Sequence, residues 1–278
     1  MAIIDRKLVF LGVGQVARAL ADIALQSSAD DATYRYLLYG TTRSAERADE
    51  IRSLGIQPVI IDSFENLGNL LADAFVVVSF PPDPVSDDVA CSVAAGASGI
   101  VYISSTAVYG KTEGLVDEKT EVDAQSPQAR ARLDAENKWL QVGASIIRAP
   151  GIYGRGSGLH QRLRSGTYRL PGDGSNYVSR IHVDDLAQMI MMALNTNQRG
   201  QVFLSGDTQP TTHREIVEWL VSRLELPFPE SIPLEQCHYT QRGNRKVDAA
   251  KSLEKLSVNL RFPSYKEGYE HELHSQSS

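Results

Sequence analysis

The sequence predicts an α/β fold built on a doubly wound parallel sheet, with a smaller C-terminal region that binds substrate. Short apolar runs alternate with amphipathic stretches through the first half of the chain, and a glycine-rich turn directly follows the first run. Parallel strands buried on both faces form nearly continuous apolar runs, joined by crossover helices. Ligands of such sheets bind beyond the carboxyl ends of the strands.

The apolar runs predict strands, and the stretches with apolar residues at helical spacing predict helices. The predicted strands are Lys7–Leu11, Tyr34–Tyr39, Pro58–Ile61, Phe75–Phe80, Ile100–Ile103 and Ala144–Ile147. The predicted helices are Gln15–Gln26, Ser44–Leu54 with Ser44 as the N-cap, Phe64–Leu71, Pro84–Ala95 and Gln128–Gln141.

The pattern changes after Gly154, where glycines crowd into an irregular stretch that ends near Gly174. Helical patterns return at Val183–Leu194, Thr212–Leu224 and Ala249–Leu256, and Gln201–Leu204 is expected to join the sheet as a strand. We therefore divide the chain into a nucleotide-binding domain over 1–154 and a substrate-binding region over 155–278, partly packed back on the sheet.

Composition and charge exclude several functional classes. Lys and Arg total 28 and Asp and Glu total 34, a net charge of −6 that argues against a nucleic-acid partner. The two cysteines, Cys91 and Cys237, cannot build a disulfide framework or a zinc site, so no metal is expected. The first apolar run is too short for a signal peptide, and no stretch approaches the ~20 apolar residues of a membrane span. We expect a cytoplasmic protein with no membrane partner.

The first strand leads directly into a GxGxxA motif, Gly12-Val13-Gly14-Gln15-Val16-Ala17, which opens a helix. Gly12 allows a tight turn, Gly14 lets the backbone approach a pyrophosphate, and Ala17 permits close packing of helix on strand. The helix N-terminus offers unpaired N–H groups to phosphates. The motif predicts a dinucleotide-binding Rossmann domain, to which Gln15 and Val16 contribute.

The end of the second strand favours NADP over NAD. An NAD site places an acidic residue there to bind the ribose 2′-hydroxyl. This chain has Thr41, Thr42 and Arg43, with no acid before Glu46. Two hydroxyls and a guanidinium suit a 2′-phosphate.

Two further strand ends supply candidate cofactor contacts. Asp62 either contacts the adenine or caps the helix predicted at Phe64. Phe80, Pro81 and Pro82 follow the fourth strand, where a ribose would pass, although the prolines also serve to end a strand.

Three later segments resemble the extended short-chain dehydrogenases/reductases, in their epimerase/dehydratase branch. They are Ile103–Gly110 (ISSTAVYG), Ile147–Gly154 (IRAPGIYG) and Arg180–Asp185 (RIHVDD). The resemblance places the Ser/Thr position of the family at Ser105 and implies a Tyr-x-x-x-Lys pair on the following helix. That helix has Gln128 and Arg132 at those places, and no Tyr-x-x-x-Lys occurs in the chain. Because glutamine cannot titrate, the chain resembles the atypical members of the family.

The resemblance, the strand-end positions of the two tyrosines, the clustered charge of the arginines and the titratable ring of His182 together suggest which residues surround the cofactor and substrate. Ser104, Arg132, Pro150 and Gly151 are the further candidates for cofactor contact. Ser105, Tyr109 and Tyr153 are the catalytic candidates, although both tyrosines also fit simple packing within their loops. Thr106, Arg155, Arg162, Arg180 and His182 are the substrate-binding candidates. For the arginines a solvated face remains open, and for His182 a structural bond to the backbone or Asp184. Asp184 and Asp185 are expected to cap the helix that follows.

Three functions remain open. The first is an NADP-dependent oxidoreductase, epimerase or dehydratase acting on a small polar molecule such as a nucleotide sugar or another anion. The second is a non-catalytic NADP(H) sensor or regulatory protein, which the missing Tyr and Lys favour. The third is a non-redox isomerase or lyase on the same scaffold. The resemblance implies a homodimer formed through the helices at Pro84–Ala95 and Gln128–Gln141, whereas the strong charge of the second helix favours a monomer, so both states remain open.

Overall fold

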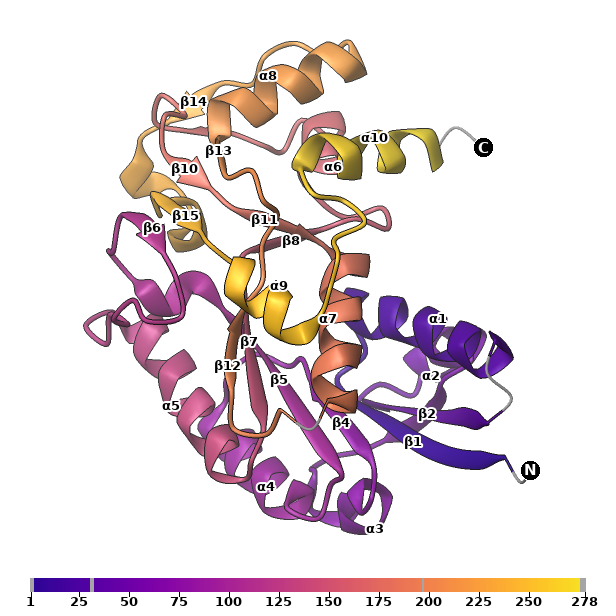
Figure 1. Cartoon of the computed structure of the whole chain (residues 1–278). Helices are drawn as coiled ribbons and strands as arrows, with labels where there is room; N and C mark the ends of the chain where they lie inside the picture. The colour runs from indigo at the N-terminus through magenta and orange to yellow at the C-terminus, as the bar shows by residue number, and fades with distance from the viewer. Residues whose placement is uncertain (1–2, 31–32, 197, 276–278) are drawn as a thin grey trace.

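Seven parallel strands form the central sheet of the computed structural model, which describes residues 3–30, 33–196 and 198–275 (Figure 1). The strand order is β12-β7-β5-β4-β1-β2-β3, and every neighbouring pair is parallel. The strands are β1 (Ile4–Leu11), β2 (Tyr34–Thr42), β3 (Gln57–Ile60), β4 (Phe75–Val78), β5 (Gly99–Ser105), β7 (Ser145–Ala149) and β12 (Val202–Leu204). The predicted doubly wound sheet is confirmed.

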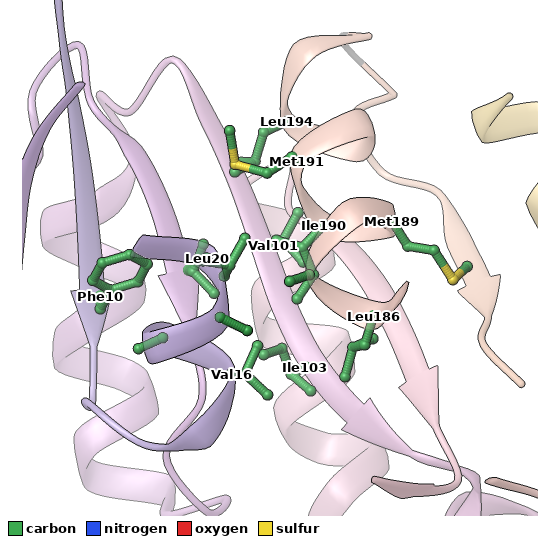
Figure 2. Close-up of a cluster of buried hydrophobic side chains, with 14 of the residues drawn as sticks. Phe10, Val16, Leu20, Val101, Ile103, Leu186, Met189, Ile190, Met191 and Leu194 are labelled. Carbon is green, nitrogen blue, oxygen red and sulfur yellow. The ribbon is translucent and has the colours of Figure 1, made fainter. Parts of the chain in front are cut away.

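Helices cover both faces of the sheet. One face carries α1 (Gln15–Asp30), α2 (Arg47–Ser53) and α7 (Val183–Asn195), and the other carries α3 (Gly68–Leu71), α4 (Pro84–Ala94) and α5 (Pro127–Gln141). Strand β1 serves both cores, because Leu8 and Phe10 pack into the first cluster and Val9 and Leu11 into the second. Figure 2 shows the first cluster, where side chains of α1 and α7 meet those of β5.

Helix ends follow local sequence signals in some places and not in others. Asp83 caps α4 by accepting a hydrogen bond from the Ser86 amide, and Pro84 occupies the first helical position. The N-cap predicted at Ser44 is wrong, since α2 begins at Arg47. The single helix predicted over Phe64–Leu71 is also wrong, because a 3₁₀ turn, Glu65–Leu67, precedes α3.

The second half of the chain contributes to the sheet and extends beyond its carboxyl edge (Figure 1). The strand predicted at Gln201–Leu204 is confirmed as β12, which pairs with β7. Short strands outside the central sheet pair in twos, and the first two of them precede residue 154. They are β6 (Gly114–Val116), β8 (Gly151–Tyr153), β9 (Leu170–Pro171), β10 (Tyr177–Val178), β11 (Arg180–His182), β13 (Thr211–Thr212), β14 (Ser231–Ile232) and β15 (Arg245–Val247). The helices are α6 (Leu159–Arg164), α8 (His213–Leu224), α9 (Ala250–Leu256) and α10 (Tyr265–Ser275).

The outer part of this half has a core of its own. Leu159 and Leu163 of α6, Ile216 and Leu220 of α8, and Tyr269 of α10 belong to one buried cluster. In contrast, α7 and β12 pack with the first half, so the two parts interleave along the chain. The division at residue 154 stays a prediction. Within the described ranges, no helix combines the length and apolar character that a membrane span requires.

Candidate functional site

The GxGxxA turn is tied to two neighbouring strand ends. Gly12 adopts a φ of +96°, which favours glycine. Its amide donates to Thr41 Oγ1 at 2.9 Å, and its carbonyl accepts from Ser79 Oγ at 3.0 Å. Thr41 lies at the end of β2 and Ser79 directly follows β4, so both flanking strands hold the turn in place.

A cavity of about 420 Å³ opens beside this turn, and we name it the β2 cavity. Its lining comes from the carboxyl ends of β1, β2, β3 and β4. The lining residues are Gly12, Val13, Thr41, Thr42, Arg43, Arg47, Ile61, Phe64, Phe80, Pro81, Pro82, Asp83 and Ser86. The structure thus brings together seven predicted cofactor contacts: Gly12, Thr41, Thr42, Arg43, Phe80, Pro81 and Pro82.

The other cofactor contacts predicted in the motif, and Asp62, lie outside the lining of the β2 cavity. Val16 and Ala17 are buried in the core, as close packing of α1 on the sheet requires. Gln15 Nε2 donates to the carbonyl of Gly154 at 2.6 Å. Asp62 neither lines the cavity nor caps the turn at Glu65, whose amide instead donates to Ser63 Oγ.

Gly14 leaves an open approach to the start of α1. A Cβ placed on Gly14 would meet no heavy atom within 4 Å, although α1 begins at the next residue. The first amides of a helix lack partners within the helix and attract anions. The residues present therefore fit a dinucleotide whose pyrophosphate lies against Gly14.

Two guanidiniums flank the end of β2. Arg43 lies within 3.5 Å of Ser86 Oγ, and Arg47 Nη2 donates to the carbonyl of Val13 at 2.9 Å. Sequence reasoning missed Arg47, which lies four residues after Arg43, at the start of α2. Asp83 shares the cavity, but its carboxylate accepts the Ser86 amide of α4, and its pKa is lowered chiefly by hydrogen bonds from Ser86.

A second cavity, of about 550 Å³, lies beyond the carboxyl ends of β5 and β7, and we name it the arginine cavity. Its lining includes six predicted residues: Ser105, Thr106, Pro150, Gly151, Arg162 and Arg180. The other lining residues are Ala107, Ile152, Gly156, Ser157, Gly158, Leu159, Gln161, Tyr168, Val178, His213, Thr240, Gln241 and Arg245. Because β4, β5 and β7 are neighbours in the sheet, both cavities lie along one edge.

The arginine cavity has positively charged walls. Arg162, Arg180 and Arg245 line it, and within the described part of the chain none of them lies within ion-pair distance of a carboxylate. No Asp or Glu belongs to the described lining. The Nε of Arg180 is buried without a hydrogen-bond partner among the described residues. Unpaired buried donors are costly, so this wall is suited to an anionic ligand.

A tyrosine–histidine pair in this wall escaped sequence reasoning. Tyr168 Oη lies 3.2 Å from His213 Nδ1, and both side chains are buried. Burial, reinforced by Arg180 and Arg162, lowers the pKa of His213 to about 3, so the imidazole is neutral. Burial raises the pKa of Tyr168 to about 12. No local pattern connects residues 45 positions apart in the chain.

The two predicted catalytic tyrosines lie outside the arginine cavity. Tyr109 is fully buried, and its hydroxyl donates to the Asp117 carbonyl at 3.0 Å and accepts from Arg148 Nη1 at 3.2 Å. Tyr153 is also fully buried, and it packs so closely on Gly268 that a Cβ there would clash with the Tyr153 hydroxyl. Burial raises the pKa of both hydroxyls. Neither side chain is placed to touch a ligand in this cavity.

Two other residues that were selected on family resemblance form hydrogen bonds with side chains of the first half. Ser104 Oγ donates to Glu136 Oε1, and Arg132 Nη1 donates to the hydroxyl of Tyr102 at 3.1 Å. Neither side chain lines either cavity. Gln128, which replaces the family tyrosine, is exposed in the first turn of α5.

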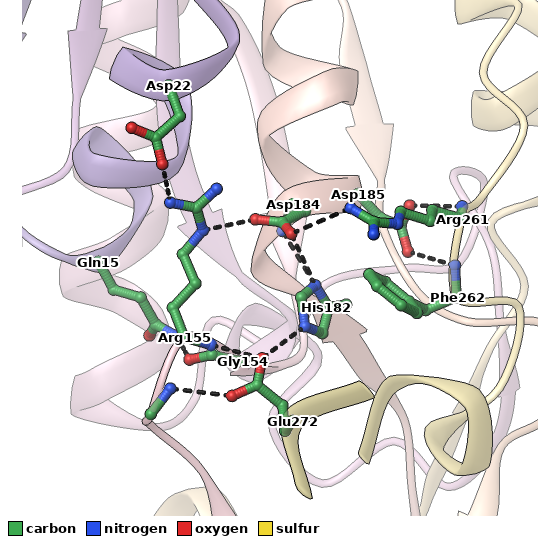
Figure 3. Close-up of polar contacts among 11 residues, drawn as sticks. Gln15, Asp22, Gly154, Arg155, His182, Asp184, Asp185, Arg261, Phe262 and Glu272 are labelled. Atoms are coloured by element: carbon green, nitrogen blue, oxygen red, sulfur yellow. Dashed lines mark hydrogen bonds and ion pairs between the residues drawn. The ribbon is translucent and has the colours of Figure 1, made fainter. Parts of the chain in front are cut away.

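Arg155 and His182 form a polar network behind the arginine cavity (Figure 3). Arg155 pairs with Asp22 and Asp184, so its charge is already compensated. His182 is buried and caps α7 by accepting the Asp184 amide at Nδ1, 3.2 Å away. The expected capping by Asp184 and Asp185 is therefore wrong.

Comparison with known proteins identifies related chains. Residues 89–206 match the model of the NAD dependent epimerase/dehydratase family. Protein YeeZ of Escherichia coli K12 is 27% identical over 166 residues, 54% of this chain, and the chain spans only 59% of that relative's length. A solved structure of a conserved protein of unknown function from Silicibacter pomeroyi is 26% identical, covers 98% of this chain and 100% of its own, and has a TM-score of 0.81.

A further solved structure is that of the Bacillus cereus UDP-glucuronic acid 4-epimerase, described in complex with UDP-glucuronic acid and NAD. It is 20% identical, covers 98% of this chain and 100% of its own, and has a TM-score of 0.79. At this identity the likeness shows the fold alone.

Proposed function

Because residues 89–206 match the model of the NAD dependent epimerase/dehydratase family, we propose that this chain acts on a small anionic substrate with a bound nicotinamide dinucleotide. The reaction is an oxidoreduction, epimerisation or dehydration with non-standard acid/base residues. The observation that carries this proposal is the arginine cavity, in which Ser105 shares one chamber with three guanidiniums that lie outside ion-pair distance of the described carboxylates. A fold alone does not specify function, whereas a charged cavity constrains the ligand.

The β2 cavity and the open start of α1 support the dinucleotide. Gly12 and Gly14 would lie along the pyrophosphate, with Phe80 and Pro81 beside a ribose. The Bacillus cereus neighbour, which shares the fold, was described with NAD. A bound nicotinamide would supply or accept a hydride, while the chain itself supplies position and charge.

Arg43 and Arg47 support NADP rather than NAD. Both line the β2 cavity at the end of β2, where a ribose 2′-phosphate of a bound NADP would lie. The Thr42 hydroxyl accepts the Ser44 amide at 3.1 Å and donates to the Ser44 carbonyl at 3.3 Å, so the proposal rests on the two guanidiniums. A planar guanidinium binds phosphate oxygens bidentately. The charge of Arg47 is shared with Glu50, whose carboxylate lies 3.5 Å away.

Replacing Arg43 or Arg47 by alanine is expected to weaken NADP binding about tenfold or more and NAD binding little. A charge-assisted hydrogen bond contributes roughly 1.5–3 kcal/mol. Calorimetric titration with NADP⁺ and NAD⁺ measures the difference. The control is Arg52→Ala, because Arg52 lies on the same helix, pairs with Asp49 and lies outside the cavity. Equal losses for both nucleotides would contradict the 2′-phosphate assignment.

Ser105, at the Ser/Thr position of the family, lines the arginine cavity, whereas the two predicted catalytic tyrosines do not. Its Oγ accepts the Ala107 amide at 3.1 Å, which leaves the hydroxyl hydrogen to donate to a substrate oxygen. Thr106 lies beside it in the same wall. We propose that Ser105 orients a carbonyl or carbinol, while Arg162, Arg180 and Arg245 hold the anionic part of the substrate.

Replacing Arg180 by methionine is expected to weaken anion binding at least about tenfold, since it removes a charged donor and keeps the aliphatic stem. Titrations with UDP-glucuronic acid, the ligand of the Bacillus cereus neighbour, and with inorganic pyrophosphate measure this loss. Arg169→Met is the matched control, because Arg169 pairs with Glu230 and lies outside the cavity. If neither probe binds the wild-type chain, the anionic substrate class is wrong.

A non-catalytic NADP(H) sensor is the second candidate. It is favoured by the exposed Gln128 and by the buried positions of Tyr109 and Tyr153, which leave the conventional proton donor without a replacement. A sensor would bind NADPH and NADP⁺ with different affinities and oxidise nothing. A non-redox isomerase or lyase would turn over substrate without net consumption of NADPH.

Calorimetric titration with NADPH, NADP⁺, NADH and NAD⁺ tests the proposal. Tight binding of the phosphorylated pair is the expected result, and it justifies a screen of carbonyl substrates for oxidation of NADPH. Failure of all four nucleotides to bind would overturn the proposal. The glycine turn would then be a relic of an ancestral site.

A further inference from the structure

A strained turn leads from β8 into the wall of the arginine cavity. Gly154 and Ser157 exchange two backbone hydrogen bonds, of 2.8 and 3.0 Å. Between them Arg155 and Gly156 adopt φ values of 50° and 77°. Positive φ at both central positions is typical of type I′ turns, which prefer Asn, Asp or Gly. An arginine at the first central position costs free energy locally, so tertiary contacts must hold it there.

Contacts from three helices hold this turn (Figure 3). The Arg155 guanidinium bonds Asp22 of α1 and, through Nε at 2.6 Å, Asp184 of α7. The amides of Arg155 and Gly156 donate to the Glu272 carboxylate of α10 at 2.7 and 2.9 Å. Burial raises the pKa of Glu272, but the His182 bond and these two amides outweigh it and lower that pKa to about 2. The carboxylate is therefore ionised and accepts both amides at neutral pH.

The GxGxxA motif contributes a further contact to the same turn. Gln15, which follows Gly14 and begins α1, donates from Nε2 to the Gly154 carbonyl at 2.6 Å. This residue belongs to the segment proposed to cradle the pyrophosphate. A dinucleotide on that segment would therefore lie next to a side chain that already holds the turn.

The turn also determines where one guanidinium of the arginine cavity lies. Gly156, Ser157 and Gly158 line the cavity, and Gly158 is the N-cap of α6. Leu159, Gln161 and Arg162 of α6 line it as well. A shift of the turn would move this stretch of wall, and Arg162 with it.

We propose that Gln15 and Arg155 are positioning residues that couple dinucleotide binding to anion binding in the arginine cavity. The bound dinucleotide holds Gln15 and α1, and these hold the turn and α6 in the geometry that the anion requires. Coupling between sites is reciprocal, so the anion tightens dinucleotide binding by the same factor. This inference rests on the proposed function, since it assumes that the dinucleotide binds at the glycine turn.

Hydrogen–deuterium exchange of the full chain, with and without saturating NADPH, tests the coupling. In the wild-type protein, NADPH is expected to slow exchange over residues 154–164. Gln15→Met keeps the length of the side chain but removes the Nε2 donor. At an NADPH concentration that saturates this variant, as measured by calorimetric titration, the protection over residues 154–164 is expected to be lost. Gln26→Met is the matched control, because Gln26 is exposed on the same helix, and it should behave as the wild type.

A second measurement uses inorganic pyrophosphate as the anion probe. NADPH is expected to raise pyrophosphate affinity fivefold or more in the wild type and in Gln26→Met, but not in Gln15→Met or Arg155→Gly. Arg155→Gly relieves the backbone strain while removing the clamp, so it separates positioning from stability.

The possible outcomes separate the coupling from the proposed function. If NADPH binds but leaves exchange over 154–164 unchanged, or if Gln15→Met keeps full protection, the coupling is refuted and the proposed function stands. If NADPH does not bind the wild type, the proposed function fails and the coupling fails with it.

Discussion

Gly14→Val is expected to leave the fold intact and to lower dinucleotide affinity about 100-fold. A Cβ at Gly14 meets no heavy atom within 4 Å, so the side chain begins in open space in the ligand-free chain. The same space is needed by a pyrophosphate that approaches the backbone. Loss of two charge-assisted hydrogen bonds, at roughly 1.5–3 kcal/mol each, corresponds to this factor or more. Calorimetric titration with NADPH and a thermal melt measure affinity and stability separately.

Gly12→Ala provides the contrast. Gly12 has a φ of +96°, and a Cβ there would lie 3.3 Å from Ser79 Oγ. This substitution is therefore expected to lower the melting temperature, whereas Gly14→Val is not. Unchanged NADPH affinity in a folded Gly14→Val protein would mean that the pyrophosphate does not lie at this turn.

Glu136→Gln is expected to lower the free energy of unfolding by about 3–5 kcal/mol. Glu136 is 2% exposed and accepts hydrogen bonds from Arg148 Nε and Nη2, at 3.1 and 2.8 Å, and from Ser104 Oγ. The substitution leaves the Arg148 guanidinium buried without its counter-charge. The pair joins α5 to β5 and β7 beside Ser105, so we also expect weaker anion binding. Urea unfolding measures the loss of stability.

Two further variants separate this buried pair from ordinary surface pairs. Glu50→Gln removes a carboxylate that pairs with Arg18 and Arg47 in solvent, and it should change stability by less than about 1 kcal/mol. Replacing both partners, as Glu136→Leu with Arg148→Met, should recover much of the loss, because no buried charge is then left unpaired. A cost below about 1 kcal/mol for Glu136→Gln would show that water reaches Arg148.

The scaffold could be predicted from local patterns. Apolar runs such as Phe75–Phe80 and the spacing in Gln15–Gln26 are near-neighbour properties of the chain, and both elements form where expected. Errors occur where two local signals compete. Thr42 Oγ1 accepts the Ser44 amide, for instance, and α2 starts three residues after the predicted cap.

The candidate site was predicted only in part. Strand-end residues such as Thr41, Phe80 and Ser105 were identified, because parallel strands deliver their carboxyl ends to one edge. Arg245 and His213 were missed, since long connections bring them to the cavity from distant parts of the chain.

By itself the sequence determined the doubly wound sheet and its glycine turn, and it predicted that the end of β2 favours a phosphorylated dinucleotide. These depend on residue periodicity and on backbone freedom at single positions such as Gly12. Only the tertiary structure decided which polar side chains face a ligand. Arg155 is compensated by Asp22, 133 positions away, whereas Arg180 has no ion-pair partner among the described residues. Whether a charge has an ion-pair partner depends on groups that folding brings together, and a local sequence pattern does not show which groups those are.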